Sequence, residues 1–293
     1  MSADILHRFL FDDLDIRGAV VRLGPVWQQL LAGRDYPAPV VRMLGEMCAT
    51  TLLLADNLKQ AGRLTVQLRG DGAVPLLVID CDETLNLRAM AQHERGAIGA
   101  NHGDASPVEL LGDGQLLLSL DLPELRAPYQ SIVPLNGASI AEIFEHYLEQ
   151  SEQLASHFFL AASADGIAGL FVQKMPGADA RDADGWARVE ALASTVRADE
   201  LLDLDAERLL TRLFGEETVR LFAARPITHH CPENREKVAT MLLSLGREEV
   251  YAALEERGEV VIRDDLSNRE YRFDKAAIDA LFSHTPATPP SVH

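Results

Sequence analysis

The stretch Leu64-Thr65-Val66-Gln67-Leu68 alternates apolar and polar side chains and runs into the turn Gly70-Asp71-Gly72. A second, strongly apolar run, Pro75-Leu76-Leu77-Val78-Ile79-Asp80, follows it directly. Alternation with a period of two is typical of a half-buried β-strand. Glycines beside an aspartate supply the backbone angles that a tight turn needs. The stretch therefore predicts an antiparallel hairpin.

The same turn recurs as Gly112-Asp113-Gly114 and again leads into an apolar run, residues 115–120. We expect a hairpin here as well. Glycine-rich turns also cradle phosphates in nucleotide-binding loops. Those loops carry Lys-Ser or Lys-Thr and open a helix, and neither feature follows these turns. The pattern therefore favours hairpins over a nucleotide site.

Helices and further strands surround these hairpins. Residues 9–13 and 16–23 are typical of two short strands, and a helical apolar stripe follows Pro37 and Pro39 and ends before Gly62, a predicted C-cap. Residues 139–153 predict a second helix, with Ser139 and Glu142 as a capping box. Residues 158–162 and 167–173 bracket a Gly-containing turn and predict another hairpin.

The pattern changes after Ala178, where helical faces continue without turn-and-strand alternation. Two amphipathic helices are expected in this connector. Their apolar faces consist of Trp186, Val189, Leu192 and Val196 in the first helix and Leu209, Leu210, Leu213 and Phe214 in the second. The last segment predicts helices over 235–245 and 247–256, the first capped by Asn234 and stopped by Gly246, and then a hairpin over 258–273.

Composition excludes several classes of function. Lys and Arg number 27 against 45 Asp and Glu, so the net charge is −18, which disfavours a nucleic-acid partner. Three cysteines, Cys48, Cys81 and Cys231, cannot form a framework of paired disulfides. The N-terminus shows no signal peptide, and we count no apolar run of about 18 residues that would span a membrane. We expect a cytoplasmic protein with a packed core.

Many ordered stretches of the chain resemble the 33 kDa heat-shock chaperone family, the redox-regulated bacterial holdases. The matching stretches are residues 44–46, 58–62, 67–72, 87–89, 112–114, 129–133, Tyr147, 150–153, 169–176, 200–202 and 212–214. The resemblance implies an α+β fold in three parts: a mixed core with sheets and long helices (1–178), a helical linker (179–226) and a small α+β C-terminal domain (227–293).

The resemblance also implies ATP-independent binding of unfolding client proteins under heat or oxidative stress, with a homodimer as the active form. Family members hold zinc through Cys-x-Cys and Cys-x-x-Cys while they are reduced and inactive. Oxidation expels the zinc, forms two disulfides and unfolds the C-terminal domain and linker. In this chain the four ligand positions fall on Cys231, Glu233, Asp264 and Ser267, so only one cysteine is retained.

This departure leaves two interpretations of the C-terminal domain. Cys231, Glu233 and Asp264, with His229 or His230 nearby, are donors from which a mixed zinc site could be built. Alternatively these residues are solvated and the domain is metal-free, which we expect, so no cofactor is predicted. Loss of a zinc site removes on the order of 10 kcal/mol of folding free energy from a small domain. The redox switch is then absent, and stability of the domain depends on temperature.

We therefore predict a holdase of this family without its zinc and disulfide switch. Unfolding of the C-terminal domain and connector would expose the faces Trp186–Val196 and Leu209–Phe214 to clients, although constitutive client binding by the core remains an alternative. A scaffold or regulatory binding protein that keeps only the fold is the rival function. An enzyme is not expected: His157, His229 and His230 have no Gly-x-Ser-x-Gly or His-Glu-x-x-His motif beside them.

Overall fold

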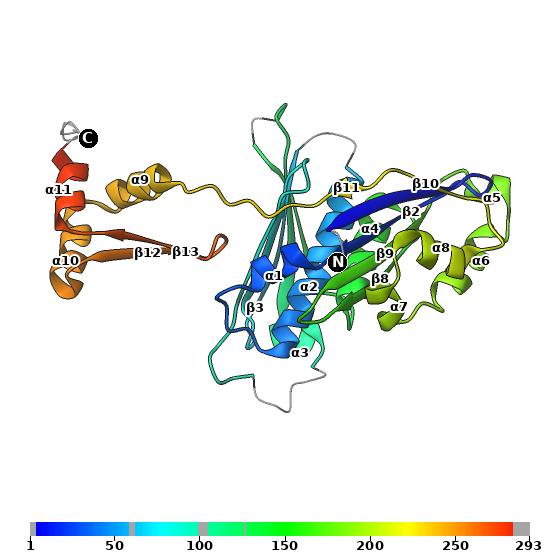
Figure 1. Cartoon of the computed structure of the whole chain (residues 1–293), viewed down its shortest axis with the longest axis horizontal. Helices are drawn as coiled ribbons and strands as arrows, with labels where there is room; N and C mark the ends of the chain where they lie inside the picture. Colours follow the sequence, from blue (N-terminus) through cyan, green and yellow to red (C-terminus); the bar gives the residue numbers. More distant parts are fainter. Residues whose placement is uncertain (1–3, 59–61, 99–104, 126, 284–293) are drawn as a thin grey trace. The chain divides into compact units, whose positions relative to one another are not determined.

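The computed structural model describes residues 4–58, 62–98, 105–125 and 127–283. The chain divides into two compact units, Met1–His230 and Cys231–His293, and each is described by itself. Figure 1 labels the elements. The first unit contains β1 (Ile5–Phe11), β2 (Ile16–Leu23), α1 (Pro25–Leu31), α2 (Ala38–Asp56), β3 (Arg63–Gly70), β4 (Leu76–Cys81), β5 (Leu87–Gln92), α3 (Pro107–Leu111), β6 (Gly114–Asp121), β7 (Tyr129–Pro134), α4 (Ile140–Glu152), β8 (Ser156–Ala162), β9 (Ile167–Lys174), α5 (Ala178–Arg181), α6 (Gly185–Ala193), α7 (Ala198–Asp203), α8 (Ala206–Phe214), β10 (Val219–Leu221) and β11 (Arg225–Pro226).

Two antiparallel sheets form the framework of the first unit. One sheet has the order β10-β1-β2-β9-β8, with β11 also paired to β1, and the other has the order β5-β4-β3-β6-β7. The predicted hairpins β1–β2, β3–β4 and β8–β9 are confirmed by their pairing registers. The mixture of sheets and helices confirms the predicted α+β class.

The second Gly-Asp-Gly turn does not form the hairpin that was predicted for it. It connects α3 to β6 and packs against the first turn, where Asp113 N donates to Asp71 Oδ1 at 2.9 Å and Gly72 N donates to Leu111 O at 2.7 Å. Gly70 and Gly72 allow this approach, since a Cβ on either would lie 2.5 Å or less from a carbonyl oxygen of α3. The first turn therefore closes the β3–β4 hairpin, whereas the second leads from α3 into β6, which pairs with β3.

Helix α2 lies in the core and packs against both sheets, on β8 and β9 of one and on β4 and β5 of the other. Most of its residues are buried, including Cys48, and burial raises the pKa of the Cys48 and Cys81 thiols well above the ordinary range. By length and mean hydropathy α2 would qualify as a membrane span, although no such run was expected from the sequence. However, 67% of the 18-residue stretch that meets this criterion is buried inside the protein.

Two predictions about helix ends need correction. Helix α2 ends at Asp56 with Asn57 as its C-cap, so Gly62 is not the cap, and residues 59–61 lie outside the described part of the chain. Ser139 caps α4 by accepting from Glu142 N at 3.2 Å. The Glu142 carboxylate accepts from Ala138 N and not from Ser139, so the capping box is only half formed.

The second unit is a small α+β unit with its own core. It contains α9 (Arg235–Leu245), α10 (Arg247–Arg257), β12 (Val260–Asp264), β13 (Arg269–Phe273) and α11 (Lys275–Ser283). Its two predicted helices and its hairpin are confirmed, whereas α11 was not predicted. The core is thin: the fully buried apolar residues are Leu242, Val250, Leu254, Val260, Tyr271, Phe273 and Ile278.

Candidate functional site

A large apolar face of the β10-β1-β2-β9-β8 sheet is covered by the helical connector. Because side chains alternate along a strand, Ala19 and Val21 of β2 face the core that contains α2, whereas Ile16 and Val20 face the other way. Figure 1 shows α6, α7 and α8 over the sheet. The sheet residues beneath this cover are Phe9, Phe11, Ile16, Val20, Ala161, Ala168, Leu170 and Val172, and Leu14 of the β1–β2 turn lies with them.

The residues that were predicted to bind clients form the underside of this cover. Val189, Leu209, Leu213 and Phe214 are at most 3% exposed. Trp186, Leu192 and Val196 are partly buried against the same cluster. The structure therefore brings both predicted apolar faces together on one sheet surface. While the connector is docked, Val189, Leu209, Leu213, Phe214 and the sheet residues beneath them are shielded from other proteins, whereas Trp186, Leu192 and Val196 are shielded only in part.

An aromatic cluster joins the end of the connector to the sheet. The Phe214 ring meets Phe11 edge-on at a centroid distance of 4.9 Å and lies 6.3 Å from Phe9. Gly18 on the neighbouring strand makes room for Phe9, because a Cβ there would lie 2.2 Å from the Phe9 ring. Aromatic pairs stabilise by about 0.5–1.5 kcal/mol beyond the free energy gained by burying their surface. This cluster therefore contributes strongly to docking of the connector.

Arg22 of β2 holds the connector from the sheet side. It donates to Leu204 O at 2.6 Å and to Leu202 O, which are carbonyl groups at the C-terminal end of α7. Partial burial lowers the pKa of Arg22, and the nearby Asp205 and Asp203 oppose that shift. A guanidinium at a helix C-terminus satisfies carbonyls that have no partner within the helix and favours the helix dipole.

His157 of β8 forms a second polar attachment, between the core helix α4 and the connector helix α6. Its Nδ1 lies 3.4 Å from Glu145 Oε1, and its Nε2 lies 3.0 Å from Glu190 Oε1. The ring also stacks on Trp186 at 5.6 Å with an interplanar angle of 11°. The hydrogen bond to Glu145 raises the pKa of His157, partial burial opposes this, and the charges of Glu145 and Glu190 add to the increase.

This arrangement predicts a pH dependence of connector docking. Because the pKa of His157 is raised in the docked state, its contribution is fully present below about pH 6.5, the unfolded pKa, and is lost as pH rises through the folded pKa. We expect His157→Gln to reduce docking by about 0.5–1 kcal/mol at pH 6 and to have little effect at pH 8.5. Hydrogen exchange of α6 amides as a function of pH measures this. Equal effects at both pH values would contradict it.

The four C-terminal positions do not fit a structural zinc site. The Asp264 carboxylate accepts from Leu266 N at 3.1 Å and from Ser267 Oγ at 2.7 Å, so these two residues close the turn between β12 and β13. Glu233 is exposed and Cys231 is partly buried. Within the described ranges, no group of three or more His, Cys, Asp or Glu residues is placed to hold a metal ion.

Of the other two candidate metal donors, His229 is engaged through its ring, and His230 is held through its backbone. His229 Nδ1 lies 2.7 Å from Leu87 O, and His230 N donates to Asn86 Oδ1 at 2.7 Å. Both contacts hold this segment beside Asn86 and Leu87, at the start of β5.

Comparison with known proteins identifies the family of this chain. The pattern of the family described as Hsp33 protein matches residues 4–274. The chain belongs to the Hsp33 family. A 33 kDa chaperonin of Methylobacillus flagellatus is 42% identical over 96% of this chain and 95% of its own length. A 33 kDa chaperonin of Pseudomonas aeruginosa is 40% identical over 99% and 98% of the two chains.

A solved structure shares the fold of this Hsp33-family protein. The crystal structure of the 33 kDa chaperonin from Thermotoga maritima superposes with a TM-score of 0.81, and the match covers 96% of this chain and 98% of that one. Their sequences are 22% identical, so this likeness establishes the fold alone. The family match and the relatives' names establish a chaperone function, as the sequence predicted.

The apolar faces of this site follow from helical periodicity in the sequence, whereas the polar contacts made by Arg22 and His157 do not. Arg22 and His157 contact groups far along the chain, at Leu202–Leu204 and Glu190. A charged residue within an apolar strand was the available signal for Arg22. It could not identify the partner, because the partner is a backbone carbonyl.

Proposed function

We propose that this protein is an ATP-independent holdase whose client-binding surface is the apolar sheet face under α6–α8. One observation carries the proposal: the connector covers a continuous apolar surface that includes the rings of Phe9 and Phe11, against which Phe214 of the connector packs. Exposed apolar patches of several hundred Å² are typical of protein-binding sites, and a cover keeps such a patch from aggregating at rest. Release of α6–α8 exposes the sheet and the connector faces Trp186–Val196 and Leu209–Phe214 together.

We propose further that the zinc and disulfide switch of the family is lost and that heat releases the connector. Cys48 and Cys81 are buried, with raised thiol pKa values, which makes both unreactive toward oxidants. Cys48 and Cys81 are therefore poor partners for a disulfide with Cys231. The second unit depends on a thin apolar core, so its stability follows temperature.

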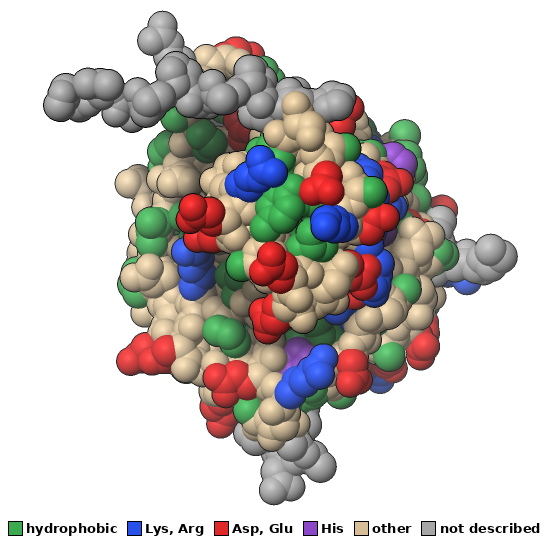
Figure 2. Space-filling model, turned by 90° about the vertical axis from the view of Figure 1, so that its left-hand side faces the viewer, with side chains coloured by type: hydrophobic (Ala, Val, Ile, Leu, Met, Phe, Trp, Pro, Cys, Tyr) green, Lys and Arg blue, Asp and Glu red, His purple; other side chains and the backbone are tan. Residues whose placement is uncertain are grey.

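The remaining parts of the proposal concern partners and location. The clients are unfolding proteins, the active form is a homodimer, and the protein acts in the cytoplasm. The net charge of −18 opposes nucleic-acid binding. On the face that Figure 2 presents, Lys and Arg side chains are interspersed with Asp and Glu rather than gathered into a basic patch.

Metal content and peroxide response test the lost switch. We expect the purified protein to contain no stoichiometric zinc. Its suppression of citrate synthase aggregation should increase on mild heating and stay unchanged after hydrogen peroxide alone. One zinc per chain, or strong activation by peroxide at low temperature, would sink this part of the proposal. No suppression under either condition would argue against the holdase itself.

A further inference from the structure

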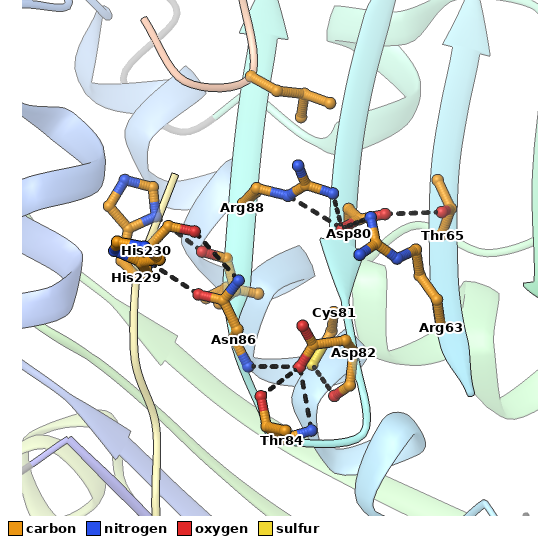
Figure 3. A network of polar contacts seen from close by, with 12 residues as sticks. Arg63, Thr65, Asp80, Cys81, Asp82, Thr84, Asn86, Arg88, His229 and His230 are labelled. Carbon is orange, nitrogen blue, oxygen red and sulfur yellow. Dashed lines mark hydrogen bonds and ion pairs between the residues drawn. The ribbon is translucent and has the colours of Figure 1, made fainter. Parts of the chain in front are cut away.

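Residues 227–230, here called the strap, lie beside residues 85–87, where β5 begins at the outer edge of its sheet. This strand is at the edge of the β5-β4-β3-β6-β7 sheet, so one side of its backbone has no neighbouring strand from the sheet itself. The strap runs parallel to β5 next to Asn86 and ends the first unit. Figure 3 shows Asn86, His229 and His230 meeting at this edge.

The strap forms main-chain and side-chain hydrogen bonds with the backbone groups at this edge. Leu87 N donates to Thr228 O at 2.8 Å, and Thr228 N donates to Leu85 O at 3.1 Å. Asn86 Nδ2 donates to His230 O at 3.1 Å, and the backbone N of His230 donates to the Asn86 side chain in return. These contacts resemble a short added strand that uses one asparagine side chain in place of a backbone group.

One apolar side chain anchors the strap. Ile227 is 4% exposed and belongs to the core cluster that includes α2. Thr228 and His230, in contrast, are exposed. The strap therefore places a single side chain in the core, and most of its other contacts are hydrogen bonds to main-chain atoms. Such a site has little preference for sequence, because every peptide carries the same backbone groups.

We propose that the edge of β5 is a second client-binding site, which accepts an extended apolar segment of an unfolded protein by strand addition in place of the strap. When the strap leaves, the N–H of Leu87 and the carbonyls of Leu85 and Leu87 lose their partners, and the Ile227 pocket opens. An incoming segment supplies a carbonyl, an N–H and one apolar side chain at the same places. The proposal rests on the proposed holdase function, since it names where an unfolded chain binds.

The position of the strap in the chain links this site to the release of the connector. Arg225, just before the strap, pairs with the buried Asp56, and the residue after the strap, Cys231, begins the second unit. In the proposed function heat releases the connector, and we expect heat to release the strap as well, so that the two client surfaces open together.

Ile227→Asp in the full-length protein tests the site, with Thr228→Asp as the matched control on an exposed neighbour. The measurement is hydrogen exchange at the Leu87 amide, with and without reduced, carboxymethylated lactalbumin as a permanently unfolded probe. We expect exchange at least ~10-fold faster in Ile227→Asp than in the control, as for a locally opened strand. Adding the probe should restore the protection.

Binding of the probe is followed separately by fluorescence anisotropy. If the probe binds and the Leu87 amide stays unprotected, the strand-addition site is wrong while the holdase function stands. If the probe binds neither variant nor the heated parent protein, the holdase function fails as well. Asn86→Ala, which removes the two contacts to His230 and keeps the Ile227 anchor, replaces Ile227→Asp if circular dichroism shows that the latter is unfolded. The same outcomes then decide.

Discussion

Replacing Leu213 by Asp is expected to switch the chaperone on at temperatures where the parent protein is inactive. Leu213 is 3% exposed beneath α8, in the cluster that joins the connector to the sheet. Burying a carboxylate there without a partner, together with the lost apolar contacts, costs about 3–5 kcal/mol, so α8 should undock. The measurement is suppression of luciferase aggregation at 25 °C, with binding of a hydrophobic dye as a second readout.

Thr211→Asp is the matched control for this change. Thr211 lies on the same helix, is exposed, and receives the same charge. We expect the control to keep both the parent level of suppression and the parent dye binding. Undocking of α8 in Leu213→Asp, seen by hydrogen exchange, without any gain in client binding would show that the covered face is not the client surface.

Replacing Asp56 by Asn is expected to cause the largest loss of stability of any single charge removal in the first unit. The Asp56 side chain is fully buried, and Arg8 Nε lies 2.5 Å from its Oδ2, while Arg225 pairs with its Oδ1. Arg225 also donates to Glu83 O at 2.7 Å. Removing one partner of a fully buried ion pair costs about 3–5 kcal/mol. Arg8 and Arg225 are 48% and 37% exposed and regain contact with water, so we expect a cost at the lower end of this range, about 3 kcal/mol. A decrease in Tm of about 10 °C follows for a unit of this size.

Asp12→Asn provides the control for the Asp56 change. Asp12 also pairs with an arginine, Arg220, but the Asp12 side chain is 28% exposed, whereas that of Asp56 is fully buried. Exposed ion pairs contribute about 0–1 kcal/mol, so the expected change in Tm is small. Both variants are measured by thermal denaturation at one pH and salt concentration. Equal decreases in Tm for Asp12→Asn and Asp56→Asn would show that burial of Asp56 is not the reason its ion pairs stabilise the fold.

The fold was predictable from sequence where local signals agree with tertiary packing. The β3–β4 and β8–β9 hairpins followed from alternation and turn glycines, and α8 followed from its apolar stripe. The second Gly-Asp-Gly turn misled the prediction, because its glycines serve a close approach to the first turn and not a hairpin. Local sequence cannot distinguish these two uses of glycine.

The candidate site was predictable only in its apolar half. Val189, Leu209 and Leu213 could be identified from helical periodicity, and the structure places them on one sheet. The polar half depends on contacts across long sequence separations, such as His157 with Glu190. The strap was not predictable either, since its attachment to β5 is made largely by backbone atoms and one asparagine side chain.

Photo-crosslinking from the sheet tests the central claim most directly. Phe159 lies on the face under the connector, whereas its neighbour Phe158 points into the opposite core beside Phe171, with ring centroids 4.7 Å apart. A photoreactive benzoylphenylalanine is placed at either position, and the protein is heated with an unfolding client. We predict crosslinks to the client from position 159 and not from position 158. Client that is bound but crosslinks to neither position, or equally to both, would contradict the account.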